Sequence, residues 1–148
     1  MSCSLNSSNK IILWHQLLII NYIVGIYTIL NSKKKYVKYI LIFHFITFSI
    51  YLLTVNIYTN KTRLRYTILD VLHTCIKISN LLLLLNYNKL LTINGIILLF
   101  TIQVSWIIFN YNCPMMMFYT DNSKITLKSK VFVPSYTIIQ IIKLMFLL

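Results

Sequence analysis

IILWHQLLIINYIVGIYTIL, residues 11–30, is a run of apolar and neutral polar residues without a single Asp, Glu, Lys or Arg. An α-helix rises about 1.5 Å per residue, so about 20 residues cross the ~30 Å hydrocarbon core of a bilayer. The run is longer than the hydrophobic part of a signal peptide, and a chain without alanine offers no Ala-x-Ala cleavage site. It therefore predicts an uncleaved membrane-spanning helix.

Three further stretches predict additional spans. Residues 39–58 and 91–109 are similarly long and uncharged. Residues 67–87 differ, because they contain Asp70 and Lys77 among eleven Leu, Ile and Val residues. The aliphatic residues favour insertion by about 3 to 7 kcal/mol, whereas each charge near the centre opposes it by about 2.5 to 3.5 kcal/mol. We expect this stretch to span only where neighbouring helices shelter its polar groups.

The final stretch, residues 131–148, is apolar but contains Pro134, Gln140 and Lys143. Tyr136, Gln140 and Lys143 share one helical face. This pattern is equally consistent with a fifth span and with an amphipathic helix that lies in the membrane interface.

The composition supports the same fold class. Hydrophobic residues make up 58% of the 148 residues and charged residues 11%, against about 25% charged in soluble domains. A soluble domain of this length cannot bury so much apolar surface. We predict an all-α fold: a single membrane domain over residues 1–148, built as a multi-pass transmembrane bundle of four helices, or of five if residues 131–148 span. The short turn between the third and fourth helices makes them an antiparallel hairpin.

The formal net charge is +12, yet most basic residues lie between the apolar stretches. Lysines at these positions are typical of the ends of membrane helices. We therefore expect the lipid bilayer and other membrane protein subunits as partners, and no nucleic acid. The positive-inside rule leaves the orientation open, because five lysines on one side of four spans oppose seven basic residues on the other.

Codon bias gives a hint of origin. The absence of Ala and the presence of only two Gly, two Pro and two Arg, with abundant Ile, Asn and Lys, indicate an AT-rich genome such as that of a large DNA virus, a mitochondrion or an endosymbiont. This predicts a viral or host membrane, or the mitochondrial inner membrane, as the location.

Polar side chains inside the apolar stretches recur at steps of three and four residues, which places each set on one helical face. Lipid offers no hydrogen bonds, so each row is expected to face another helix. The rows are Asn21, Gly25 and Thr28; His44, Thr47, Tyr51, Thr54 and Tyr58; Tyr66, Asp70, His73, Lys77 and Asn80; and Asn94, Thr101 and Ser105. Within them we predict an intramembrane polar network of Asp70, His73, Lys77, Asn80, His44 and Tyr51.

Asp70, His73 and Lys77 support two interpretations. Ionisable groups inside a membrane often mark proton or ion pathways, and His titrates near neutrality. The second interpretation is a buried network in which the three residues neutralise one another and fix helix register. The chain has no inverted repeats or paired broken helices of the kind that transporters use, which favours the structural interpretation.

Residues suited to catalysis or metal binding are sparse. Cys3, Cys75 and Cys113 are widely spaced, and none has a His at metal-ligand spacing. No Ser or Cys lies in a recognisable nucleophile motif. Gly25 and Gly95 both fall in predicted helices, which leaves no phosphate-binding loop. We expect no catalytic residue, metal or cofactor, and the sequence identifies no small-molecule substrate.

The segment from residue 70 to residue 114 resembles an uncharacterised family of small bacterial and large-virus membrane proteins. Members carry Asp and His near the start of one helix of a hairpin, and Trp followed by Cys at the end of the other. The matching residues here are Asp70, Leu72, His73, Trp106, Asn110, Cys113 and Pro114. The acidic residue that the family pattern has after the Cys is absent. The resemblance implies a membrane hairpin and no particular activity.

These observations favour a non-enzymatic function. The leading hypothesis is a small integral membrane protein that acts through helix–helix contacts, as an accessory or structural component of a membrane or membrane complex. The second hypothesis is a proton or ion pathway through Asp70, His73 and Lys77, and the third is a membrane-embedded enzyme.

Overall fold

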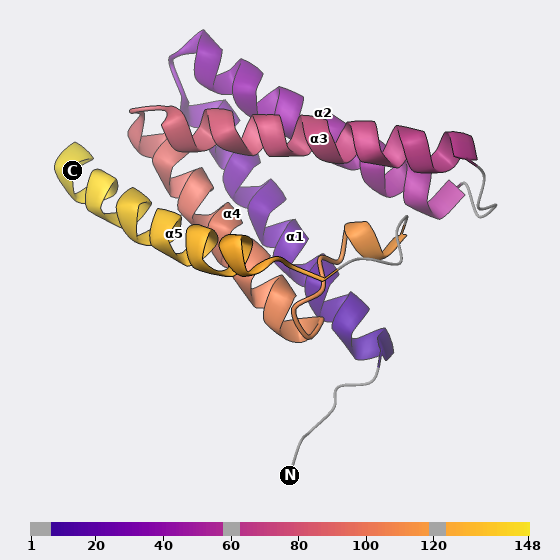
Figure 1. Ribbon diagram of the computed structural model, residues 1–148. Coiled ribbons are helices and arrows are strands. Elements are labelled where there is room, and N and C mark those ends of the chain that lie inside the picture. The colour runs from indigo at the N-terminus through magenta and orange to yellow at the C-terminus, as the bar shows by residue number, and fades with distance from the viewer. Residues whose placement is uncertain (1–6, 58–62, 119–123) are drawn as a thin grey trace.

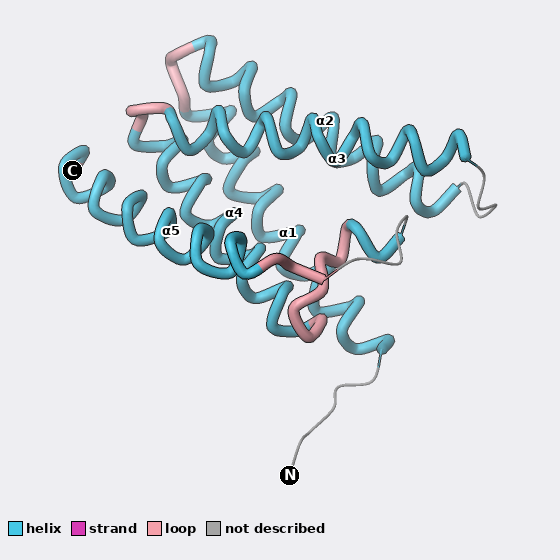
Figure 2. Tube along the Cα trace, viewed as in Figure 1, coloured by secondary structure: helices cyan, strands magenta, loops and turns pink. Residues whose placement is uncertain are grey.

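The computed structural model describes residues 7–57, 63–118 and 124–148, and this part of the chain is helical (Figure 2). Cys3 and Tyr58, which the sequence singles out, lie outside it. The elements in chain order are α1 (Ser7–Asn31), α2 (Lys35–Ile57), α3 (Arg63–Leu85), α4 (Lys89–Ile108), the short 3₁₀ turn η1 (Met116–Phe118) and α5 (Leu127–Leu147). The prediction of an all-α fold is confirmed.

All five α-helices are long and apolar enough to cross a membrane. The fifth helix begins at Leu127, four residues before the predicted stretch, and continues through Pro134. The other helices also extend beyond the predicted runs at their N-terminal ends, for example to Lys35 in α2 and Arg63 in α3. Lys and Arg are good helix formers with long, flexible side chains, so a charge limits an apolar run without ending the helix.

The helices form two layers (Figure 1). Helices α2 and α3 pack side by side in one layer, and α4 lies between α1 and α5 in the other. The layers meet where α3 contacts α4 and α1 contacts α2. They diverge with distance from the α3–α4 turn. This divergence separates the middle of α3 from the far ends of α4 and α5.

Asn88 forms the α3–α4 turn and begins α4. Its side chain accepts hydrogen bonds from the backbone N–H groups of Leu90 and Leu91, at 3.0 and 3.2 Å. Such an N-cap satisfies donors that the first helical turn leaves unpaired. The prediction that the third and fourth helices form a hairpin is confirmed.

Polar residues join α1 to α4. Asn21 donates to the Thr101 hydroxyl at 2.6 Å, and Asn94 donates to the Thr28 hydroxyl at 2.7 Å. The two contacts are seven residues apart on each helix, so they lie on one seam two turns in length. The polar rows of the first and fourth helices therefore face each other, as their spacing predicts.

The C-terminal half of α5 contacts the end of α3. Gln140 donates to the Leu84 carbonyl at 3.0 Å, and the Lys143 ammonium donates to the Leu84 and Asn86 carbonyls at 2.8 Å each. The last carbonyls of a helix lack intrahelical partners and carry partial negative charge. Gln140 and Lys143 are the residues that made residues 131–148 equally consistent with a span and with an interfacial helix. In the structure they connect α5 to α3.

Candidate functional site

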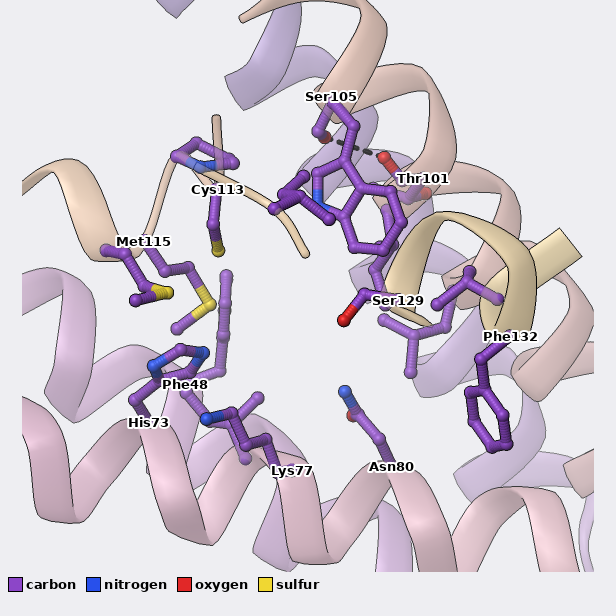
Figure 3. Close-up of a pocket in the computed structure, with 18 of the residues that line it drawn as sticks. Phe48, His73, Lys77, Asn80, Thr101, Ser105, Cys113, Met115, Ser129 and Phe132 are labelled. Atoms are coloured by element: carbon purple, nitrogen blue, oxygen red, sulfur yellow. Dashed lines mark hydrogen bonds between the residues drawn. The ribbon is translucent and has the colours of Figure 1, made fainter. Parts of the chain in front are cut away.

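A cavity of about 1090 Å³ lies between α3 and the layer of α1, α4 and α5. Residues from all five helices line it, together with the segment that connects α4 to α5 (Figure 3). Pockets that hold small molecules commonly measure about 300 to 1,000 Å³. The space is therefore large enough for a substantial ligand.

Helix α3 contributes His73, Lys77 and Asn80 to the lining. Figure 3 shows these three side chains on the side of α3 that faces Cys113, Met115 and α5. They follow one another at steps of four and three residues, so they project from one face of the helix. Three of the six predicted network residues are therefore side by side on the cavity wall.

Asp70 has a different environment. Its side chain is exposed and is not part of the cavity lining. Seven residues separate Asp70 from Lys77, which is about 10.5 Å along a helix axis. Among the residues that the structure describes, no ion pair joins the two. The structure thus holds the carboxylate and the ammonium apart instead of pairing them.

His44 of α2 also lines the cavity, and it is buried and held by its neighbours. Its Nδ1 atom lies 2.8 Å from the Ser79 hydroxyl of α3, which itself donates to the Ile76 carbonyl. The His44 ring stacks on Phe48, with the centroids 6.3 Å apart and the planes at 9°. His44 therefore joins α2 to α3 through a hydrogen bond, and its ring is fixed by aromatic packing.

Tyr51 is fully buried, and its hydroxyl donates to the Met115 carbonyl. This bond ties the segment after α4 to α2. It holds Met115 over the cavity, where Met115 contributes to the lining. Tyr51 thus helps to build the cavity without lining it.

The segment after α4 makes a sharp turn. Asn110 and Tyr111 adopt left-handed backbone conformations, with φ of 53° and 59°. The Tyr111 N–H donates to the Trp106 carbonyl at 2.6 Å, and the Ile125 N–H donates to the Tyr111 carbonyl at 3.0 Å. The sequence predicts a span that ends at residue 109, but it does not predict that the next residues fold back over the cavity.

Cys113 points into the cavity from this segment. Burial raises the pKa of its thiol, while hydrogen bonds from the backbone of Met116 and Met115 and the charge of Lys77 lower it in part. A thiol with a raised pKa is protonated near neutral pH and is a poor nucleophile. Among the described residues, no group of three His, Cys, Asp or Glu side chains is placed to hold a metal ion.

The charged residues that line the cavity are all basic among the described residues. Lys77 enters from α3, and Lys124 and Lys128 approach from the start of α5. No Asp or Glu is found among the described lining residues. The contribution of Lys124 and Lys128 could not be inferred from the sequence, because both belong to a polar segment whose position depends on the turn after α4.

Comparison with protein-family models, with curated proteins and with solved structures gives no match to the chain. The resemblance of residues 70–114 to a family of membrane hairpin proteins therefore stays a prediction.

Proposed function

We propose that the chain is an integral membrane protein with five spans that acts through contacts with another membrane protein, as an accessory or structural component and not as an enzyme. Five helices of suitable length and hydropathy support membrane insertion. Large apolar side chains, among them Ile23, Leu30 and Leu53, cover much of the exterior. Such a surface is favourable in lipid and costly in water.

The observation that carries the partner contact is a polar stripe on α3. Thr67, Asp70 and Thr74 follow at steps of three and four residues, and all three are exposed. Asp70 is the eighth residue of α3, about 10 Å from its start along the helix axis. The stripe therefore runs into the apolar span instead of staying at its end.

A carboxylate at this depth needs a partner. Insertion of an Asp near the centre of a helix costs about 2.5 to 3.5 kcal/mol, and such residues normally face protein or water instead of lipid. The Asp70 side chain is exposed, it does not line the cavity, and among the described residues it has no ion-pair partner. The partner that best fits the stripe is a transmembrane helix that presents Lys, Arg or hydrogen-bond donors at the depth of Asp70.

A proton or ion pathway is less well supported. A relay requires its ionisable groups to share one path, whereas Asp70 lies outside the cavity that His73 and Lys77 line. A direct measurement separates the two functions. Purified protein in liposomes should give no pH-dye signal above protein-free liposomes.

Site-specific crosslinking in native membranes tests the proposal. A photoreactive amino acid at position 74 should give one defined protein adduct, and Asp70→Leu should abolish that adduct. The same probe at Ile138, an exposed apolar residue of α5, serves as the matched control and should label lipid. His15→Leu removes an exposed polar side chain from α1 and should leave the adduct at position 74 intact. Lipid adducts alone at position 74, or an adduct that survives Asp70→Leu, would overturn the proposal.

A further inference from the structure

We infer that the cavity binds an anionic lipid, with the acidic headgroup at Lys77 and hydrocarbon chains along the apolar wall. The inference goes beyond the partner contact on α3, because it concerns the cavity that His73, Lys77 and Asn80 line and not the exposed stripe of Thr67, Asp70 and Thr74. It rests on the proposed membrane location only in that lipid must be available to the protein.

The wall of the cavity is suited to hydrocarbon. Phe48, Ile76, Leu98, Ile102, Trp106 and Met115 are among the residues that line it. Acyl chains pack against aliphatic and aromatic side chains through many dispersion contacts, and this wall contains few polar groups that would oppose them. A volume of about 1090 Å³ exceeds what a few solvent molecules need. An elongated apolar ligand fits this wall better than a small polar one.

Lys77 and Asn80 form a polar part of the cavity lining, which is suited to an anion. Lys77 is the fifteenth of 23 residues in α3, so it lies far from both ends of the helix, and its exposed side chain lines the cavity. Asp70 is two turns away on the same helix and does not line the cavity. A Lys in an apolar surrounding is stabilised by a negative partner and is otherwise costly. A phosphate or carboxylate headgroup supplies the missing charge.

Asn80 adds a second polar group next to Lys77. Its Oδ1 atom is buried and accepts no hydrogen bond from the described residues. An unsatisfied buried amide oxygen costs about 1 to 3 kcal/mol, which a ligand hydroxyl would recover once the amide turns its oxygen toward the cavity. Figure 3 shows the Asn80 side chain pointing from α3 across the cavity toward Ser129. Phospholipid headgroups that combine a phosphate with hydroxyl groups match this pair of residues.

Lys124 and Lys128 complete the electrostatic pattern on the other side. Both are exposed residues that also line the cavity. They lie close to the start of α5, where a lipid headgroup would enter. Three ammonium groups around one hollow attract an acidic lipid over a zwitterionic one, since each basic residue near an anionic membrane surface contributes about 1 kcal/mol.

The two tryptophans of the chain make binding directly measurable. Trp14 and Trp106 both line the cavity, and the sequence contains no other Trp. Brominated acyl chains quench Trp fluorescence on contact. The full-length protein is reconstituted in phosphatidylcholine nanodiscs that contain a small fraction of either brominated phosphatidylglycerol or brominated phosphatidylcholine.

Brominated phosphatidylglycerol is expected to quench at a mole fraction about tenfold lower than brominated phosphatidylcholine, and Lys77→Gln should remove this difference. Lys77→Arg should retain it. Lys35→Gln, which changes an exposed lysine at the start of α2, is the matched control and should also retain it. Circular dichroism verifies that each variant keeps its helical content.

Three results would overturn the inference. Equal quenching by the two lipids is the first, and a selectivity that persists in folded Lys77→Gln is the second. The third is displacement of the brominated lipid by millimolar inorganic phosphate, which would identify the ligand as a free anion. Because this assay uses purified protein without a partner, its failure leaves the crosslinking test of the α3 stripe unaffected.

Discussion

At the scale of single residues, buried polar side chains in this fold are mostly held across helix contacts. Asn21 reaches Thr101, Asn94 reaches Thr28, and His44 reaches Ser79. These bonds satisfy groups that lipid would leave unpaired. Asp70 and Lys77 do not fit this pattern, because each projects from α3 without an ion-pair partner among the described residues. For this reason both proposals centre on α3.

Cys113 provides a residue-scale prediction on pH dependence. Burial raises the pKa of its thiol, and only the thiolate reacts with alkylating agents. In a variant with Cys3 and Cys75 replaced by Ser, alkylation of folded protein by iodoacetamide should rise at a more alkaline pH than alkylation of the same protein unfolded in SDS. Mass spectrometry over a series of pH values gives both profiles.

Lys77 should influence the same profile. Its charge lowers the pKa of Cys113, so Lys77→Met should move the alkylation profile to still higher pH, while Lys35→Met should not. A profile that Lys77→Met leaves in place, or moves toward acid, would contradict the proximity of the two side chains in the cavity.

At the scale of helices, the apolar runs predict the elements well, because a span of about 20 apolar residues leaves the backbone few alternatives to an α-helix. The predicted ends of the helices were less accurate than the predicted helices themselves. Helix α2 begins at Lys35 instead of residue 39, and α5 at Leu127 instead of residue 131. Charged and polar residues at these ends continue the helix, and Thr126 caps α5 by accepting from the Ser129 N–H at 3.3 Å.

The role of α5 was not predictable from its own sequence. Lys143 and Gln140 gave an amphipathic pattern that suits an interfacial helix equally well. Their interpretation depends on the carbonyl groups at the end of α3, and these come close only through the α3–α4 turn. A contact between residues almost 60 positions apart leaves no trace in local periodicity.

Lys143 supports an element-scale prediction. Lys143→Met removes two hydrogen bonds to the end of α3. The free energy of unfolding in an SDS titration should fall by about 1 kcal/mol. Amide hydrogen exchange should rise in residues 141–147 and stay unchanged in α1.

The matched control is Lys35→Met, which removes a lysine that has no carbonyl contact of this kind. It should change neither stability nor exchange in α5. Equal effects of the two substitutions would mean that Lys143 acts through its charge alone and that its contact with α3 has no energetic weight.

At the scale of the whole molecule, the described turns and helix ends lie at two opposite ends of the fold. The α1–α2 turn, the α3–α4 turn and the end of α5 lie at one end of the fold, and the start of α1 and the α4–α5 connection lie toward the other. In the proposed five-span arrangement, Lys33, Lys34 and Lys35 lie on the same side as the end of α5. Basic residues near span ends favour the cytoplasmic side.

This arrangement predicts a membrane topology. In a variant without native Cys, single Cys residues at positions 33, 87 and 148 should react with a membrane-impermeant maleimide from the same side, and Cys at positions 9 and 124 from the opposite side. Labelling of intact and permeabilised vesicles makes the comparison. Reaction of positions 9 and 148 from one side would show that α5 does not cross.

The cavity lies beyond what the sequence could predict, although the spacing of His73, Lys77 and Asn80 correctly places the three on one face of α3. The space itself results from the divergence of the two layers and from the turn at Asn110 and Tyr111. Both depend on packing between distant segments. Periodicity assigns a residue to a face of its helix, but it does not say what that face meets.

The position of α5 makes the order of assembly important. Only 11% of its apolar stretch is buried within the fold, against 44% for α4, and yet its N-terminal half forms one side of the hollow. The ribosome delivers α5 after the other four helices. In the proposed membrane location, the groove beside α3 stays open to the surrounding acyl chains until α5 docks, so we expect that the newly made protein can enclose a molecule that would later leave only by displacing a whole helix.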